Sequence, residues 1–188
     1  MSLSPVKQEI LETMWLNGRP MKAVEIANES KKGFPPTMMH LLGLTKMGFV
    51  SSPEKGQYVI TERGKIALGL PEITKEKATA ILAYAAHEKA FNFYVAVDKP
   101  LGIHAHNLRD FANKLDKADL SSVEFHLQRG DFETWFIMLG DEELAKKTTL
   151  LKKRNAVGEN MRKQLRGVVE HRYLELSKIA GQPVPTEQ

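Results

Sequence analysis

The chain has 188 residues, 42% of them hydrophobic and 27% charged, a balance typical of globular proteins. It contains no cysteine, which excludes disulfides and thiolate metal sites, and no apolar run that resembles a membrane span or a secretory leader. The formal net charge of +4 permits nucleic-acid binding but is far below that of a nonspecific nucleic-acid coat. We therefore expect a cytoplasmic protein without membrane contact.

The first two helices are predicted by apolar residues at helical spacing. Val6, Ile10 and Met14 recur every four residues on one face of a helix that Ser4–Pro5 opens. An Asn-Gly-Arg-Pro run ends this helix, and residues 21–29 are expected to form a second, short helix with small alanines on one side. Such a surface lets a third helix cross closely, as a helix-turn-helix requires.

The third helix is predicted by two prolines followed by one inward stripe. Pro35 and Pro36 suit the first turn of a helix, because proline has no amide to donate and its φ angle is already helical. Thr37, Leu41 and Leu44 then recur at helical spacing. The exposed side of this helix is therefore expected to be the face opposite that stripe.

A two-stranded hairpin is predicted directly after the third helix. Gly48 can take the left-handed conformation that ends a helix, and Phe49–Val50 starts an extended run. Pro53–Gly56 is a turn, and Gln57–Ile60 is the returning strand before a helix that Thr61 caps. A helix, a glycine stop and a hairpin in this order are typical of the recognition helix and wing of a winged helix-turn-helix.

Residues 4–68 resemble an archaeal or bacterial winged helix-turn-helix domain. The resemblance rests on the segments Val24–Ala27, Leu41–Val50 and Val59–Gly64. It implies three helices with a small β-hairpin wing, and a transcriptional regulator that binds double-stranded DNA. The pattern is specific for the fold rather than for the target.

The chain is expected to be mainly α-helical and to hold two domains. We expect residues 1–70 to form the winged helix-turn-helix, 71–76 a linker, 77–180 a helical bundle and 181–188 a flexible tail. Segment 91–97 is rich in aromatic and β-branched residues, which is compatible with a helix or a short strand. A helix is favoured, because no partner strand is evident.

The second domain has a distinctive motif, made of Ser122, Phe125–His126, Gly130–Phe132, Trp135 and Gly140–Ala145. On this motif, residues 88–175 are similar to a prokaryotic helical domain family of unknown function. The resemblance implies a domain boundary but no activity.

The exposed face of the third helix is the candidate DNA-reading surface. A recognition helix reads base edges in the major groove through hydrogen bonds, yet this face has no Arg, Asn or Gln. The alternative is that Met38, Met39 and Leu42 pack on a protein partner. The residues expected to contact bases or phosphates are Lys31, Lys32, Met38, Met39, His40, Lys46, Lys55, Arg63 and Lys65.

His126, Asp131 and Trp135 form the candidate site of the second domain. A histidine and an aspartate flanked by aromatic residues can act as an acid–base pair or hold a ligand. We favour a structural role, in which Asp131 caps the helix that follows, the aromatic side chains are core and His126 hydrogen-bonds locally. No catalytic residue is expected.

No metal or cofactor site is expected either. His104 and His106 fall in a helix predicted over His104–Leu115, where residues two apart point to different sides. The sequence has no His-x-x-x-His pair, and it lacks the nucleophile elbow, phosphate loop and dinucleotide fingerprint of common enzymes. An enzymatic function is therefore not predicted.

Charge is distributed unevenly in the second domain. Residues 110–143 hold nine acids and three bases, whereas residues 146–172 hold nine bases and two acids. The basic segment is either an additional phosphate-binding surface or the partner of the acidic segment, within the chain or between subunits. We favour pairing, because solvated or paired helix faces are the rule.

The sequence thus predicts a DNA-binding transcriptional regulator whose helical domain dimerises, senses a ligand or contacts a partner. A homodimer is expected, because two half-sites raise the affinity for DNA. The alternative is a protein-interaction module that uses the methionine-rich face of the third helix.

Overall fold

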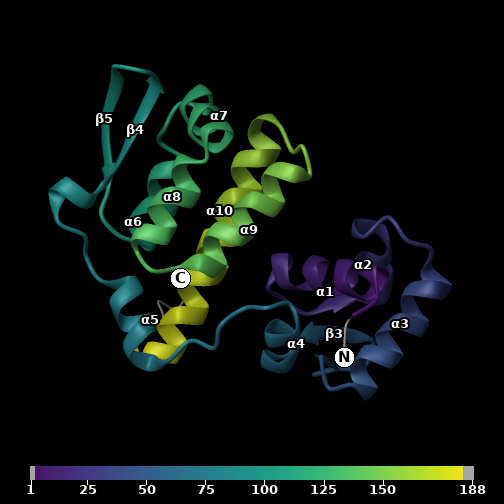
Figure 1. Ribbon diagram of the computed structural model, residues 1–188. Coiled ribbons are helices and arrows are strands. Elements are labelled where there is room, and N and C mark those ends of the chain that lie inside the picture. The colour runs from purple at the N-terminus through teal and green to yellow at the C-terminus, as the bar shows by residue number, and fades with distance from the viewer. Residues whose placement is uncertain (1–2, 184–188) are drawn as a thin grey trace. The chain divides into compact units, whose positions relative to one another are not determined.

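The chain folds as two compact units, each with a small antiparallel sheet among its helices (Figure 1). A computed structural model describes residues 3–183. The first unit ends at Glu72, inside the segment 71–76 expected as a linker. Residues 184–188 of the expected tail lie outside the described residues. No helix in the described part of the chain is long and apolar enough to cross a membrane.

The first unit combines helices with short strands. Its core lies between the first three helices, where Ile10, Ile26, Leu41 and Leu44 have no exposed surface. The elements are α1 (Pro5–Asn17), β1 (Met21–Lys22), α2 (Ala23–Glu29), α3 (Phe34–Lys46), β2 (Val50–Ser51), β3 (Gln57–Ile60) and α4 (Glu62–Ala67).

Helix α3 buries the stripe that the sequence predicts. Thr37, Leu41 and Leu44 are its buried residues, and the helix packs against α1 and α2. The predicted helix stop is also confirmed, because Gly48 has a φ angle of 74°, in the left-handed region. Likewise, the hydroxyl of Thr61 caps α4 by accepting a hydrogen bond from the backbone amide of Gly64 at 3.1 Å.

The sheet of the first unit has the antiparallel order β1–β3–β2, with Met21 paired to Tyr58. The sequence predicts the β2–β3 hairpin but assigns Met21 to a helix, and that assignment is wrong. The side chain of Met21 is fully buried, and the backbone amide of Lys22 donates to the Glu25 carboxylate at 2.7 Å. This contact makes α2 begin after Lys22. Met21 and Lys22 therefore stay outside the helix and pair with β3.

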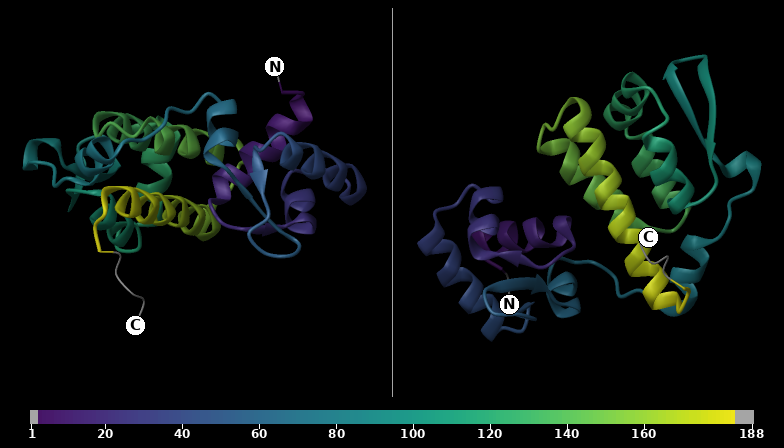
Figure 2. Two further views of the ribbon diagram at one scale, coloured as in Figure 1. Left: turned by 90° about the horizontal axis from the view of Figure 1, so that it is seen from below. Right: turned by 180° about the vertical axis from the view of Figure 1, so that it is seen from behind.

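The second unit packs α5, α6, α7 and α9 against its longest helix, α10, and its hairpin lies at the edge of the unit against α6 and α7 (Figure 2). Its elements are α5 (Lys75–Leu82), the 3₁₀ turn η1 (His87–Lys89), β4 (Phe91–Ala96), β5 (Lys99–Ala105), α6 (Leu108–Leu115), α7 (Leu120–Arg129), α8 (Asp131–Met138), α9 (Glu142–Lys153) and α10 (Gly158–Ala180).

The hairpin of β4 and β5 corrects the prediction for this region. Phe91 pairs with Ala105, so residues 91–96 of the helix predicted over 91–97 form a strand. Its partner, β5, contains a proline and a glycine, which are poor strand formers and hid the pairing from sequence inspection. The second unit is therefore not the purely helical bundle that the sequence predicts.

The helix predicted over His104–Leu115 begins later than expected. Residue Leu108 starts α6, and the side chain of Asn107 caps it by accepting from the backbone amide of Asp110 at 2.8 Å. His104 belongs instead to β5. Sequence periodicity missed this boundary because the cap lies inside the predicted helix.

Charged residues of the acidic and basic segments pair with each other inside the second unit. Arg172 of α10 donates to Asp141 at 2.9 Å and to Glu143 at 2.6 Å, and all three side chains are buried. On the surface of the same helix, Arg166 pairs with Asp116. The expected pairing is confirmed for these residues, and here it occurs within the chain.

Candidate functional site

One face of α3 is an exposed stripe made almost entirely of apolar side chains. Pro35, Met39, Leu42 and Lys46 follow one another at intervals of four, three and four residues, which places them on one side of a helix. All four are exposed, Met39 to 74% and Leu42 to 53%. We call these four residues the α3 stripe. It lies opposite the buried stripe of the same helix, as the sequence predicts.

The flanks of the α3 stripe add little hydrogen-bonding capacity. Met38 is half-buried, and its sulfur accepts from the Tyr58 hydroxyl at 3.7 Å, so it faces the sheet rather than solvent. His40 is half-buried. The hydroxyl of Thr45 donates to the backbone carbonyl of Leu41 at 2.8 Å. Of the methionines expected on the DNA-reading face, Met39 alone belongs to the stripe.

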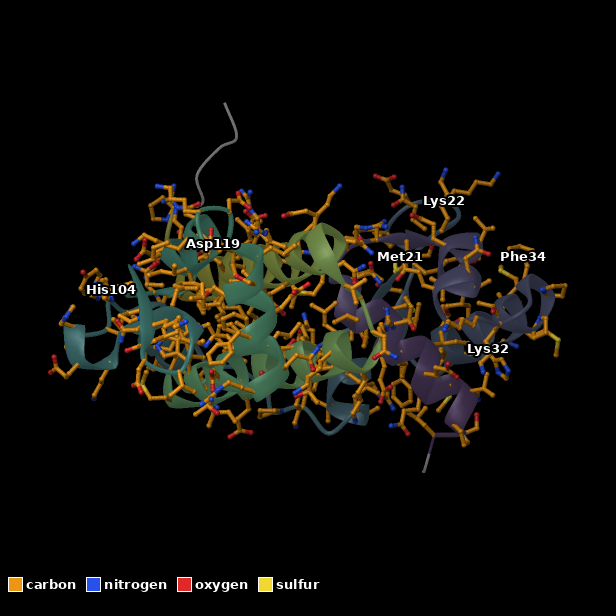
Figure 3. The ribbon with its side chains drawn as sticks, turned by 90° about the horizontal axis from the view of Figure 1, so that it is seen from above. Met21, Lys22, Lys32, Phe34, His104 and Asp119 are labelled. Carbon is orange, nitrogen blue, oxygen red and sulfur yellow. The ribbon has the colours of Figure 1, made fainter. Side chains whose placement is uncertain are left out.

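The start of α3 offers few backbone amides. Pro35 and Pro36 have none, and the Thr37 amide donates to the carbonyl of Gly33 at 3.1 Å. Phe34, labelled with Lys32 in Figure 3, is 50% exposed at this end. A helix start of this kind is a poor anion site, because anions bind there through free amides. Contacts from α3 to a phosphate group must therefore come from side chains.

Several of the cations expected to hold phosphates are exposed. Lys31 precedes α3, Lys46 ends it, and Lys55 stands in the turn of the β2–β3 hairpin. Arg63 is exposed as well, and its guanidinium lies 5.7 Å from the centre of the Phe49 ring, a cation–π contact.

Two of the expected cations are instead engaged in ion pairs. The ammonium of Lys32 lies 2.9 Å from the Glu9 carboxylate. That of Lys65 lies 3.0 Å from the Glu62 carboxylate, and its side chain is only 14% exposed. Lys65 is therefore the weakest phosphate-binding candidate of the set.

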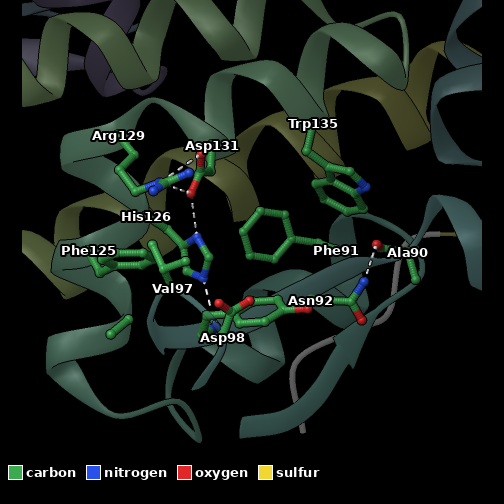
Figure 4. A pocket seen from close by; sticks show the side chains of 12 residues that line it. Ala90, Phe91, Asn92, Val97, Asp98, Phe125, His126, Arg129, Asp131 and Trp135 are labelled. Carbon is green, nitrogen blue, oxygen red and sulfur yellow. Dashed lines mark hydrogen bonds and ion pairs between the residues drawn. The ribbon is translucent and has the colours of Figure 1, made fainter. Parts of the chain in front are cut away.

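A cavity of about 430 Å³ lies in the second unit between the hairpin, α7 and α8 (Figure 4). Its walls include Phe91, Phe125 and Trp135, and the predicted pair His126 and Asp131 also lines it. The structure thus brings the three predicted residues of this domain to one cavity.

Both ring nitrogens of His126 are occupied. Its Nε2 accepts from the backbone amide of Tyr94 at 2.8 Å, and its Nδ1 lies 2.8 Å from Oδ2 of Asp131. An amide can only donate, so these partners assign the proton to Nδ1 and make the ring neutral. Burial lowers the pKa of His126 more than the bond to Asp131 raises it. A histidine without a free nitrogen is a brace for β4 rather than a general base.

The carboxylate of Asp131 accepts from His126 and, at 3.1 Å, from Nε of Arg129. The expected role as helix cap is wrong, since α8 begins at Asp131 itself and Gly130 holds the cap position. The indole nitrogen of Trp135 donates to the carbonyl of Lys89 at 2.9 Å. These side chains tie α7 and α8 to the segment that precedes and contains β4, a structural role in agreement with the favoured interpretation.

The histidines considered as metal ligands are held by carbonyl oxygens. Nδ1 of His104 bonds to Oδ1 of Asn92, and Nδ1 of His106 lies 3.0 Å from the carbonyl of Ala85. Within residues 3–183, no group of three or more His, Cys, Asp and Glu side chains is arranged to hold a metal ion.

The stability of the second unit is expected to fall as the pH drops below about 6.5. Because the folded pKa of His126 lies below its ordinary value of 6.5, the unfolded chain takes up this proton first as the pH falls. The neutral ring of His126 therefore stabilises the folded state fully above pH 6.5. This stabilisation is lost as the pH falls through the lowered pKa of the folded chain. Urea unfolding between pH 8 and 5 measures it, and His126→Gln should abolish this component while His87→Gln keeps it.

Sequence reasoning missed Phe91 and Tyr94 as parts of this cavity. Both lie in β4, and a segment assigned to a helix gives no reason to place alternate residues against α7. The available signal was the aromatic and β-branched composition of segment 91–97, which is typical of strands.

Comparison with known proteins adds no relative. A scan of protein-family models, a search of curated proteins and a search of solved structures each find no match to the chain. The function must therefore be argued from the geometry of the two units.

Proposed function

We propose that the chain is a DNA-binding transcriptional regulator whose first unit is a winged helix-turn-helix. The observation that carries the proposal is the chain order α1–β1–α2–α3–β2–β3 with the sheet order β1–β3–β2. In a winged helix-turn-helix, the third helix enters the major groove and the hairpin contacts the adjacent backbone. Here the corresponding helix carries the exposed α3 stripe.

The charge around α3 supports this proposal. The helix itself contains no carboxylate, and the exposed cations Lys31, Lys46 and Lys55 stand before it, at its end and in the hairpin turn. Phosphate contacts from such side chains supply most of the sequence-independent affinity for duplex DNA.

The second unit would serve dimerisation, ligand sensing or partner contact. Its cavity of about 430 Å³ has the size and the aromatic lining of a small-molecule site. A homodimer would place two copies of α3 on two half-sites. No catalytic step is proposed, because the ring nitrogens of His126 are both engaged.

The alternative function is a protein-interaction module. The observation that favours it is the exposure of Met39 and Leu42, since exposed apolar side chains at helical spacing also fit a groove on a partner protein. On this alternative, Met38 would contribute less, because it already contacts Tyr58.

The two functions are separated by replacing exposed lysines. Lys46→Ala and Lys55→Ala should each weaken binding to random duplex DNA and reduce the slope of log K against log salt by about one. Lys65→Ala is the matched control, because that ammonium is ion-paired and mostly covered. Unchanged binding in both test variants would contradict the proposed interface.

A further inference from the structure

We propose that α3 recognises thymine through its C5-methyl group, so that the protein prefers A·T-rich duplexes without hydrogen bonds to base edges. The inference rests on the proposed DNA-binding function and names the feature of DNA that this helix reads. It follows from the composition of the α3 stripe, from the absence of other readers on the helix, and from the chemistry of the major groove.

The α3 stripe presents carbon and sulfur where recognition helices usually present amides or guanidinium groups. Pro35, Met39 and Leu42 are its first three members, and Lys46 at the C-terminal end is the single charged one. The methionine side chain is long, unbranched and polarisable, so it can follow the groove floor and adapt to its shape.

Outside the α3 stripe, the side chains of α3 provide little hydrogen bonding to base edges. The helix sequence contains no Arg, Asn, Gln, Asp or Glu. The Thr45 hydroxyl is bonded to the Leu41 carbonyl, and His40 is half-buried. The helix therefore lacks the Arg, Asn and Gln side chains that make bidentate pairs with guanine and adenine, and Lys46 at its end is its single lysine.

The major groove offers one apolar group for such a surface, the C5-methyl of thymine. Burying a methyl group of this size against Met39 or Leu42 is worth about fourfold in affinity. Charge complementarity selects DNA over an apolar protein groove as the occupant, because Lys31, Lys46 and Lys55 are exposed and the helix bears no acid. The lysines would hold the backbone while the stripe faces the methyl groups.

Base analogues isolate the methyl group. The full chain is titrated by fluorescence anisotropy into a duplex of A·T pairs in mixed order and into the same duplex with uracil for thymine, which removes only the methyl. A G·C duplex is compared with its 5-methylcytosine counterpart, which adds a methyl at the same groove position. We expect each methylated duplex to bind more tightly, by about fourfold for every methyl contacted.

Variants assign the effect to the α3 stripe. The double substitution Met39→Ala, Leu42→Ala should bring the thymine-to-uracil ratio to about one, and it spares the core because both side chains are exposed. Ile66→Ala, at an exposed apolar residue of α4, is the matched control and should keep the ratio. Lys55→Ala should weaken binding to all four duplexes alike.

The possible outcomes distinguish failure of thymine-methyl recognition from failure of the proposed DNA-binding function. Equal binding to thymine and uracil duplexes overturns methyl recognition and leaves DNA binding in place. A ratio that persists in the double variant also overturns it, because the preference then arises elsewhere. Failure to bind any of the duplexes at low salt rejects the proposed function itself.

Discussion

Replacing Arg172 by methionine is expected to lower the free energy of unfolding of the second unit by about 3–5 kcal/mol. Its guanidinium donates to Asp141, Glu143 and Glu175, and it has no exposed surface. Burial alone would lower the pKa of Arg172, but these carboxylates outweigh burial and raise it. Methionine would remove the cation that pairs with buried Asp141 and would leave Glu143 with Lys147 as its cationic partner.

A matched control lies on the same helix. Arg166 pairs with Asp116 and Glu170 at the surface, so Arg166→Met should cost about 1 kcal/mol or less. The chain has two tryptophans, Trp15 in the first unit and Trp135 in the second. Urea unfolding followed by Trp135 fluorescence, in a Trp15→Phe background, compares the two variants. Similar losses in both would contradict the distinction between buried and surface pairs.

Gly64→Ala is expected to destabilise the first unit by about 1–3 kcal/mol, although alanine favours helices. A Cβ at this position of α4 would lie 2.3 Å from the backbone carbonyl oxygen of Phe49 and 2.8 Å from a side-chain carbon of Ile60. Contacts this short force the backbone to move, so the close packing of α4 on the sheet depends on glycine.

Gly43 of α3 provides the opposite case. A Cβ there would meet only the flexible end of Lys7, at 3.8 Å. Gly43→Ala should therefore stabilise the first unit by about 0.5–1 kcal/mol through helix propensity.

One experiment measures both the Gly64→Ala and the Gly43→Ala variants. It follows unfolding by Trp15 fluorescence, with Trp135 replaced by phenylalanine. Stabilisation by Gly64→Ala would show that α4 does not approach the sheet this closely.

The first unit was largely predictable because its elements begin and end with local signals. The stripe Thr37, Leu41 and Leu44, the left-handed Gly48 and the Thr61 cap each depend on residues within a few positions of one another. The strand at Met21 was missed because two residues carry no periodicity, and its pairing with Tyr58 is nonlocal.

The second unit was less predictable because its candidate site depends on distant contacts. The hydrogen bond between the Tyr94 amide and His126 joins residues 32 apart, and that from the Trp135 indole to Lys89 joins residues 46 apart. The sequence could group His126 with Asp131 because the two residues lie close together in the chain, on either side of Gly130. Their function as a brace required knowledge that 91–97 is mainly a strand.

The charge pairing inside the second unit was predictable only as a tendency. Opposite charges on the acidic and basic segments favour contact, yet the burial of Arg172 with Asp141 depends on how α9 and α10 pack. The sequence could not distinguish this buried pair from the surface pair of Arg166 with Asp116.

The central claim, that the first unit binds DNA, is tested most directly by fluorescence anisotropy of the full chain on random duplex DNA across a salt series. Micromolar or tighter binding at low salt is predicted, with log K falling linearly against log salt at a slope of about −0.9 for each phosphate contacted. Absence of binding at low salt, or affinity that does not change with salt, would contradict the claim and leave the exposed α3 stripe as a surface for a protein partner.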